Sequence, residues 1–302
     1  MASPFKIGVD GGGTKTECIL VDARGEIVAR HLAPGCNPNV AGPEQARLII
    51  TDALCALRDK ARSAHGAAGI AASHLYMSGN RAFWRETAAT LLDFGRVTIA
   101  DDSLPVLELA TDGAPGLVLH AGTGSFVAAR APDGSVHYAG GLGWRFGDPG
   151  SGYELGRRTI ARALLELQGW QPATRLGTLV RDHTQLGDVA EPTAITRYFY
   201  HHAEPNHVIA ALAPAVFRLA SEGDNTALAL VVESAAELLA LATRVAAKLF
   251  PDTPLDTVRA GLSGAVLTHP LVVAALVPRT PLPLTPVTAP PIEGVRRLLV
   301  RS

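Results

Sequence analysis

The sequence predicts an α/β protein built from two similar halves. Each half opens with three strand-like segments in succession, and helical patterns then alternate with further strands. Asp, Gly and Pro interrupt the apolar pattern near residues 112–115. We therefore expect an N-terminal lobe of residues 1–114 and a C-terminal lobe of residues 115–302, the second carrying a helical insertion.

The first half reads βββαβαβα. Apolar residues alternate in three segments that are separated by turns at Gly11–Gly13 and Ala23–Gly25, which predicts a three-stranded meander. A loop rich in Gly, Pro and Asn follows. The expected elements are strands at 5–9, 17–21 and 26–31, a helix ending near residue 63, a strand at 75–78, a helix at 81–92, a strand at 97–100 and a helix at 104–109.

The second half also begins with three strands, after which helices dominate. The strands are expected at 117–119, 126–130 and 136–139, the helices at 153–167, 174–183, 193–200, 206–219 and 225–250, and a late strand at 257–261. The Pro-rich residues 278–291 are expected to form a linker or an irregular surface segment. A terminal helix near 292–300 is too short to be stable alone, and the N-terminal lobe is one surface on which it could pack.

Charge and cysteine content limit the class of function. The 27 basic and 28 acidic side chains give a net charge of -1 without a basic cluster, so neither nucleic acid nor a membrane is expected as a partner. Cys18, Cys36 and Cys55 form no C-x-x-C pair, so no disulfide framework or cysteine-bound metal is predicted. There is no signal-peptide pattern, and apolar stretches such as Leu271–Val277 stop short of a bilayer span, which favours a cytoplasmic protein.

The glycine turn after the first strand predicts an anion-binding loop. Residues Gly8–Thr16 differ by one inserted residue, Thr14, from a P-loop, but a β pattern follows instead of a helix. Such a hairpin offers bare backbone N–H groups and the hydroxyls of Thr14 and Thr16 to an anion. Asp10 could face a phosphate only with a cation between them, which favours Mg²⁺. A plain hairpin turn is the alternative.

A matching turn lies at the equivalent place in the second half. Residues Ala121–Ser125 again follow an apolar strand and again supply small residues with donor groups. Two such turns facing each other across a cleft would hold a polyphosphate better than either one alone. The repetition therefore favours phosphate binding over a purely structural turn.

Three segments together resemble a known family. Asp10–Thr16, Gly122–Ser125 and Gly147–Tyr153 are similar to the BadF/BadG/BcrA/BcrD ATPase family and, within it, to the N-acetylglucosamine kinases of the actin-like and sugar-kinase ATPase superfamily. The resemblance extends over essentially the whole chain. It implies a two-lobed actin-like ATPase fold, a duplicated ribonuclease H-like architecture with mixed five-stranded sheets, with ATP and Mg²⁺ in the cleft between the lobes.

The resemblance also implies which residues contact the nucleotide. The adenosine motif of the family matches Gly261–Ala265, and Asp10 is expected to hold Mg²⁺ directly or through water. The residues expected to bind ATP are Asp10, Gly11, Gly12, Gly13, Thr14, Lys15, Thr16, Gly122, Thr123, Gly124, Ser125, Gly261, Ser263 and Gly264.

A pair of acidic residues is the candidate for the catalytic base. Asp101 and Asp102 follow a strand, at the edge where α/β proteins bind ligands, and phosphoryl transfer needs a group that accepts the proton of the attacking hydroxyl. Either residue could instead cap the next helix. The resemblance assigns the base to Asp102, with Asp101 as the alternative, and implies that a sugar 6-hydroxyl attacks the γ-phosphate.

The resemblance places the sugar on a few further residues. Asn37 and Asp148 would contact hydroxyls of the hexose, together with Asp102, Thr123 and Gly124. The alternative for Asn37 and Asp148 is ordinary turn chemistry, since Asn-Pro and Asp-Pro commonly start turns.

Three positions depart from the family pattern. Pro149 stands where a Glu is usual, which weakens the assignment of the sugar. Ser263 replaces a glycine of the adenosine motif, and His120 precedes the second phosphate turn where a small or apolar residue is usual. Neither of these two changes removes a phosphate donor.

The leading expectation is an ATP-dependent kinase that phosphorylates an amino sugar at its 6-hydroxyl. N-acetylglucosamine is the first candidate substrate, and glucosamine or another hexose is the alternative. The resemblance implies a homodimer. A non-kinase ATPase that activates a partner enzyme is a competing reading, although this chain lacks the paired cysteines that would hold an iron–sulfur cluster. A sensor of sugar and nucleotide without turnover is a third.

Overall fold

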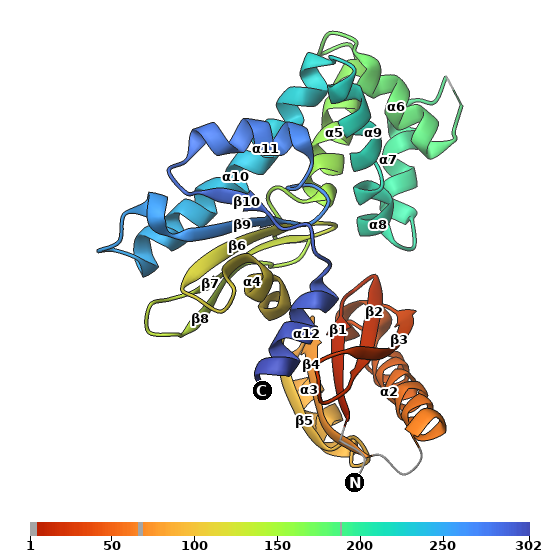
Figure 1. Cartoon of the computed structure of the whole chain (residues 1–302). Coiled ribbons are helices and arrows are strands. Elements are labelled where there is room, and N and C mark those ends of the chain that lie inside the picture. Colours follow the sequence, from red (N-terminus) through yellow and green to blue (C-terminus); the bar gives the residue numbers. More distant parts are fainter. Residues whose placement is uncertain (1–4, 66–68, 188) are drawn as a thin grey trace. The chain divides into compact units, whose positions relative to one another are not determined.

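The structure is a computed structural model that describes residues 5–65, 69–187 and 189–302. It contains two five-stranded mixed sheets with helices, as the sequence predicts (Figure 1). Its contacts divide the chain into two compact units. The first unit comprises the described residues up to Gly113 together with Ala289–Ser302, and the second comprises Ala114–Thr288.

The sheet of the first unit has the strand order β3-β2-β1-β4-β5. Strands β1 and β2 are antiparallel and so are β2 and β3, which confirms the predicted meander, whereas β1, β4 and β5 run parallel. The parallel strands therefore bring their carboxyl ends to one edge. The strands are β1 (Phe5–Gly11), β2 (Lys15–Val21), β3 (Ile27–Pro34), β4 (Ile70–Met77) and β5 (Arg96–Asp101).

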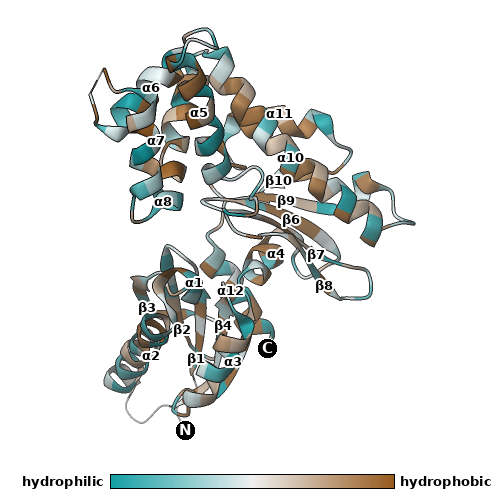
Figure 2. Ribbon diagram, turned by 180° about the vertical axis from the view of Figure 1, so that it is seen from behind, coloured by the Kyte–Doolittle hydropathy of each residue, from teal (hydrophilic) through white to brown (hydrophobic). Residues whose placement is uncertain are grey.

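Helices pack on both faces of this sheet. Apolar residues of α2 (Pro43–His65), such as Leu54, form one core with Ile7 and Leu75, while alternate strand residues face α12 (Pro291–Arg301). Figure 2 shows hydrophilic and hydrophobic residues together along α2, as expected for a helix with one buried face. The other helices of this unit are α1 (Pro38–Ala41), α3 (Arg81–Thr90) and α4 (Ser103–Thr111).

The terminal helix α12 packs within the first unit. Its residues Val295 and Leu299 are fully buried against β1 and β2, and Lys6 Nζ donates to the carbonyl of Leu299 at 2.8 Å. A Cβ on Gly8 would lie 2.4 Å from Val295, so only glycine lets the helix approach β1 this closely. The contacts therefore group this segment with the first unit, although the sequence analysis counted its residues with the second half.

The second sheet repeats the first. Its order is β10-β9-β6-β7-β8, with the same pattern of antiparallel and parallel neighbours. Strand β10 lies in the Pro-rich segment that was expected to be a linker, and that expectation is wrong. The strand has three residues at the sheet edge, where proline is tolerated and leaves little β pattern. The strands are β6 (Gly116–Ala121), β7 (Ser125–Arg130), β8 (Val136–Gly140), β9 (Arg259–Ser263) and β10 (Leu284–Pro286).

The helices of the second unit follow the prediction with two differences. The single helix expected at 206–219 is interrupted, because Pro214 lies in the first turn of α9 and a proline is favoured there, where its missing N–H costs nothing. Helix α11 was not predicted. The helices are α5 (Gly152–Leu167), α6 (Arg175–Thr184), α7 (Pro192–His201), α8 (Pro205–Ala210), α9 (Ala213–Ser221), α10 (Asn225–Leu249) and α11 (Pro270–Leu276).

Helix α10 is the one helix in the described residues that is long and apolar enough to cross a membrane, judged by length and composition. The expectation that every apolar stretch stops short of a bilayer span therefore does not hold for it. In the structure its residues Val231, Leu238 and Ala242 are buried in the core of the second unit. Such packing is typical of a core helix.

Candidate active site

Two carbonyl groups at the turn of the β1–β2 hairpin accept hydrogen bonds from other segments. Ser78 N–H donates to the carbonyl of Gly11 at 2.8 Å, and Cys36 N–H donates to that of Gly12 at 3.0 Å. The chain after β3 also lies against the turn, since a Cβ on Gly35 would be 2.0 Å from the carbonyl oxygen of Gly13. Two segments of the first unit, the chain after β3 and the residue after β4, therefore fix the backbone of this turn.

Two N–H groups of the same turn are unused, whereas that of Gly12 donates to the carbonyl of Lys15 at 3.0 Å. Gly13 and Thr14 N–H have no backbone acceptor within the described part of the chain. Two adjacent N–H groups on a rigid glycine turn make an anion-binding site. The side chains of this turn, unlike these two N–H groups, already have partners. The buried Thr16 hydroxyl donates to the carbonyl of Pro34 at 2.8 Å, and Lys15 Nζ lies 3.3 Å from Glu17 Oε2.

Asp10 lies next to this turn in β1. Burial raises the pKa of its carboxyl to about 6, an effect that Lys15 opposes and Glu17 increases. In the described residues there is no group of three or more His, Cys, Asp or Glu side chains that could hold a metal ion. A Mg²⁺ ion at Asp10 would therefore take most of its oxygen ligands from phosphate and water, as Mg²⁺ usually does.

The two neighbouring aspartates at the end of β5 have different environments. Asp101 Oδ1 accepts the N–H of Ser103 at 3.1 Å, and its Oδ2 lies 2.9 Å from Nη2 of Arg81. Asp102 occupies the N-cap position of α4 but its side chain makes no capping bond. The side-chain bond to the start of α4 is thus made by Asp101, whereas the carboxyl of Asp102 makes no capping bond and interacts with the Asp101 side chain.

Asp102 has a strongly shifted acidity. Burial, together with the negative charges of Asp101 and Asp10 and a hydrogen bond with the Asp101 side chain, raises its pKa to about 7. The electrostatic influence of Asp10 means that the ends of β1 and β5 bring these carboxyls together, as the parallel register of Gly11, Met77 and Asp101 requires. A carboxyl with a pKa near neutrality suits a residue that accepts a proton.

Asn37 caps the short helix α1. Its Oδ1 accepts the N–H of Asn39 at 2.9 Å, so the turn chemistry weighed in the sequence analysis accounts for this oxygen. A Cβ on Gly79, whose φ is +91°, would lie 2.5 Å from the same oxygen. The loop after β4 therefore passes directly over Asn37, a contact that the sequence analysis missed.

The second glycine turn repeats the pattern of the first. Gly152 N–H donates to the carbonyl of Gly122 at 2.7 Å, and Tyr153 N–H donates to that of Thr123 at 3.2 Å. Gly122 N–H is also used, by the carbonyl of Gly124 at 2.9 Å. The N–H groups of Thr123 and Gly124 have no backbone acceptor among the described residues. As in the first turn, carbonyl groups accept hydrogen bonds from other residues while two neighbouring N–H groups remain free to bind a ligand.

Asp148 is a buried acceptor beside this turn. It is 5% exposed, its Oδ1 has no hydrogen-bond partner among the residues described, and its Oδ2 would lie 3.0 Å from a Cβ on Gly124. Burial raises its pKa, which a hydrogen bond from the backbone of Gly143 opposes. The Ser125 hydroxyl donates to the carbonyl of Pro149 at 2.6 Å and so ties the two loops together. Because buried carboxylate oxygens normally accept a hydrogen bond, this oxygen is a candidate acceptor for a hydroxyl group of a ligand.

A largely apolar cavity of about 720 Å³ opens beside the second turn. The rings of Phe217 and His269 stack at 4.2 Å on its wall. Gly264, with φ +83°, allows its loop to reach β6, because a Cβ there would lie 2.3 Å from the carbonyl of Ala121. Gly261 is inside β9 and does not line the cavity. The lining residues are Gly122, Thr123, Gly152, His207, Ala210, Ala211, Ala213, Pro214, Phe217, Arg218, Ser221, Ala265, Val266 and His269.

Two of the three residues that depart from the family pattern contact each other. His120 Nδ1 lies 3.2 Å from Ser263 Oγ, and the imidazole stacks on Phe126 with ring centroids 4.8 Å apart. Burial lowers the pKa of His120 to about 4, so the ring is neutral at pH 7. These two substitutions therefore act as a pair.

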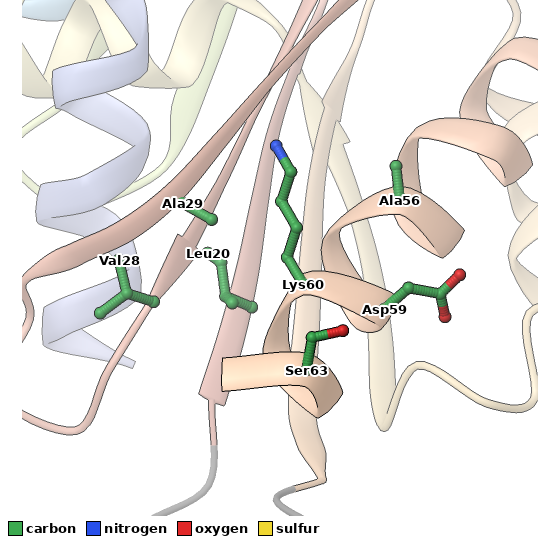
Figure 3. A pocket seen from close by; sticks show the side chains of 7 residues that line it. All are labelled: Leu20, Val28, Ala29, Ala56, Asp59, Lys60 and Ser63. Atoms are coloured by element: carbon green, nitrogen blue, oxygen red, sulfur yellow. The ribbon is translucent and has the colours of Figure 1, made fainter. Parts of the chain in front are cut away.

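Two other hollows differ in their relation to these residues. The one between α2 and the β2–β3 pair, about 540 Å³, is lined by none of the predicted site residues, and Figure 3 shows Lys60 extending along it. The other, about 820 Å³, borders Asp148 and is lined by Trp144, Phe146 and Arg157 among others. Only the second is placed to receive a group attached to a ligand at Asp148.

The profile of the BadF/BadG/BcrA/BcrD ATPase family matches residues 7–276. The chain belongs to this family. It is 27% identical over 261 residues to an N-acetyl-D-glucosamine kinase of Dictyostelium discoideum, covering 82% of this chain and 81% of the relative. It is 25% identical to a glucosamine kinase of Vibrio cholerae, covering 78% of each.

Solved structures agree with this assignment. A protein of Chromobacterium violaceum, provisionally named an N-acetylglucosamine kinase, superposes with a TM-score of 0.80 at 26% identity, over 98% of this chain and 99% of its own. The fold of this family member is thus that of its relatives throughout, both five-stranded sheets included.

Proposed function

We propose that this protein transfers the γ-phosphate of ATP to the 6-hydroxyl of an amino sugar, foremost N-acetylglucosamine. One observation carries the proposal. Each unit has a glycine turn in which carbonyls are bonded to other segments and two neighbouring N–H groups have no backbone acceptor among the described residues, and the turn in the first unit lies near Asp102, a partly buried carboxyl that makes no helix-capping bond. Glucosamine is the second candidate, because a relative with similar coverage is a glucosamine kinase.

In this proposal the two turns hold the phosphates. The N–H groups of Gly13 and Thr14 would bind one part of the triphosphate, and those of Thr123 and Gly124 another. The cavity of about 720 Å³ has room for the adenosine. The nucleotide residues expected in each unit are proposed on the basis of these free N–H groups.

Asp102 would act as the general base. Its carboxylate takes the proton of the sugar hydroxyl as the oxygen attacks, which matters most once the hydroxyl has begun to bond to phosphorus. Asp10 would hold Mg²⁺, directly or through water. When bound, this ion neutralises the charge on the phosphates. Asn37 and Asp148 would bind other sugar hydroxyls, with the unpartnered Oδ1 of Asp148 as the acceptor.

The test is ADP release with a panel of sugars in the presence of Mg²⁺. We expect N-acetylglucosamine or glucosamine to stimulate turnover well above the rate without sugar, and phosphorus NMR to place the new ester on the 6-position. If none of the amino sugars or hexoses stimulates ADP release, the proposal is wrong.

We also propose that the protein is a homodimer acting in the cytoplasm. The family resemblance supports the dimer, and three cysteines that are free in the structure suit a reducing compartment. The near-zero net charge gives no reason to expect nucleic acid or a membrane as partner. Light scattering coupled to gel filtration measures the oligomeric state, and a monomer at micromolar concentration contradicts the dimer.

A further inference from the structure

His120 lies where it can reach a ligand of the second glycine turn. It precedes Gly122 by two residues, so both positions face the same side of β6 as it ends. A Cβ on Gly122 would lie 3.7 Å from the Nε2 atom of His120. The distal nitrogen of the ring thus borders the turn whose free N–H groups belong to Thr123 and Gly124.

Neighbouring side chains fix the orientation of this ring. Ser263 Oγ lies 3.2 Å from Nδ1, and Phe126 stacks on the ring with an interplanar angle of 18°. Phe126 is itself stacked on Tyr138 at 5.2 Å. The imidazole is therefore held between the end of β9 and a row of aromatic rings on β7 and β8.

The contact with Ser263 links the position of the ring proton to the direction of one hydrogen bond. A neutral imidazole has one donor and one acceptor nitrogen. If the serine hydroxyl donates to Nδ1, the proton resides on Nε2, which has no hydrogen-bond partner among the described residues. The ring then presents a donor beside two backbone donors.

We propose that His120 donates its Nε2–H to a phosphate oxygen of the nucleotide bound at the Gly122–Ser125 turn, and that Ser263 holds the imidazole in the required tautomer. The inference rests on the proposed ATP-binding function and extends it to a nucleotide-binding residue that the family pattern lacks. It also gives a reason for the two residues to occur together, because the serine hydroxyl bonds to Nδ1 and leaves Nε2 as the donor.

The test compares the affinities for MgADP and for adenosine in three variants of His120. The amide of asparagine lies near the position of Nδ1 and does not reach that of Nε2. The amide of glutamine reaches the Nε2 position and can donate there, and phenylalanine keeps the stacking on Phe126 but has no donor. We expect H120N and H120F to bind MgADP about 10- to 100-fold more weakly, as for the loss of a hydrogen bond to a charged group, and H120Q to retain most of the affinity. Adenosine affinity should stay unchanged in all three, because adenosine carries no phosphate.

Two further variants complete the design. S263A should weaken MgADP binding less than H120N does, about 2- to 5-fold, because the ring then samples both tautomers. His137 is an exposed histidine on the edge strand β8 of the same sheet, so H137N is the matched control and should bind MgADP normally.

The outcomes separate this inference from the proposed function. If the wild type binds neither nucleotide, the kinase proposal itself fails. If the wild type and H120N bind MgADP equally well, then His120 only contacts Ser263 and the inference is wrong. A loss of adenosine affinity that parallels the loss of MgADP affinity also overturns it.

Discussion

At the scale of single residues, the adjacent aspartates at the end of β5 divide two tasks between them. Asp101 caps α4 and pairs with Arg81, whereas the buried Asp102 does neither. Burial and the neighbouring negative charges disfavour the charged form of Asp102, so this carboxyl lowers the stability of the folded state when it is charged. Carboxyl groups with strongly shifted pKa values are typical of functional sites, where side chains are arranged to bind or react with a ligand.

Replacement of Asp102 should separate activity from stability. We expect D102N to lower sugar-dependent turnover about 100-fold or more, because the base is lost. The same variant should be more stable than the wild type at pH 8, by about 1–3 kcal/mol after allowance for solvent screening. Turnover and urea denaturation measure the two effects.

The matched control is the neighbouring residue. D101N should lose stability, because the cap and the ion pair with Arg81 are weakened, and should keep more activity than D102N. If D101N is the inactive variant and D102N is active, the roles are reversed.

The stability gain of D102N should depend on pH. Burial raises the folded-state pKa of Asp102 from 3.8 to about 7. A raised pKa stabilises the wild type fully below about pH 4, and this stabilisation is lost as the pH rises through 7. As the pH rises from 4 to 7, the free energy of unfolding of D102N should therefore increase relative to that of the wild type. A difference that does not vary over this range contradicts the shifted pKa.

At the scale of elements, α12 completes the first unit from the far end of the chain. Val295 and Leu299 are fully buried, and a Cβ on Gly294 would lie 2.0 Å from the carbonyl of Pro105, so the helix lies tightly on α4 as well as on β1. The amphipathic pattern of these residues alone indicates a buried face. It does not indicate which surface covers it.

Truncation of one buried residue of α12 should destabilise the protein. We expect L299A to lower the free energy of unfolding by about 2–4 kcal/mol, because a fully buried leucine leaves a cavity. V300A is the control, since Val300 is 53% exposed and its truncation should cost about 0.5 kcal/mol or less. Urea denaturation followed by circular dichroism compares the two, and equal losses would show that α12 is not packed as described.

At the scale of the whole molecule, the same sheet occurs twice with the same strand order, and each copy ends its first hairpin in a turn with free N–H groups. The other chemistry is not duplicated. The aspartates 10 and 102 belong to the first unit, and Asp148 and the cavity beside the second turn belong to the second unit.

Ligand binding should stabilise the protein in a Mg²⁺-dependent way. ADP at 100 times its Kd should add about 2.7 kcal/mol to the free energy of unfolding, by mass action. Removal of Mg²⁺ with EDTA should abolish most of this gain, because Asp10 then faces the phosphates without a cation. D10N should reduce the difference between the two conditions. Thermal melts measure the effect, and a gain unaffected by EDTA argues against a metal at Asp10.

Local patterns in the sequence were sufficient for most of the elements. The alternation around the Gly11–Gly13 turn predicted the meander, and the family resemblance predicted the two mixed sheets. The edge strand at Leu284–Pro286 was missed, because three residues flanked by prolines carry no alternation. The break before α9 was missed as well, since the apolar period continues across Pro214.

The candidate site was predictable in part for a similar reason. Glycine turns and acidic pairs are visible in the sequence because they are contiguous, so both glycine turns and the pair Asp101 and Asp102 could be named, whereas the choice of Asp102 came from the family resemblance. The contact between His120 and Ser263 joins residues 143 positions apart. Each residue departs from the family pattern in the sequence, but residues so far apart give no local sign that they are in contact.

What the chain determines by itself is local: the order of strands and helices, the glycine turns that need backbone freedom, and the types of residue at each strand end. Tertiary structure alone decided that α12 returns to the first unit, that the side chain of Asp101 rather than that of Asp102 bonds to the start of α4, and that other segments donate to carbonyls in both turns. The physical reason is that these outcomes depend on which distant groups satisfy a buried face, a charge or a hydrogen bond, and that competition is settled only when the whole unit packs.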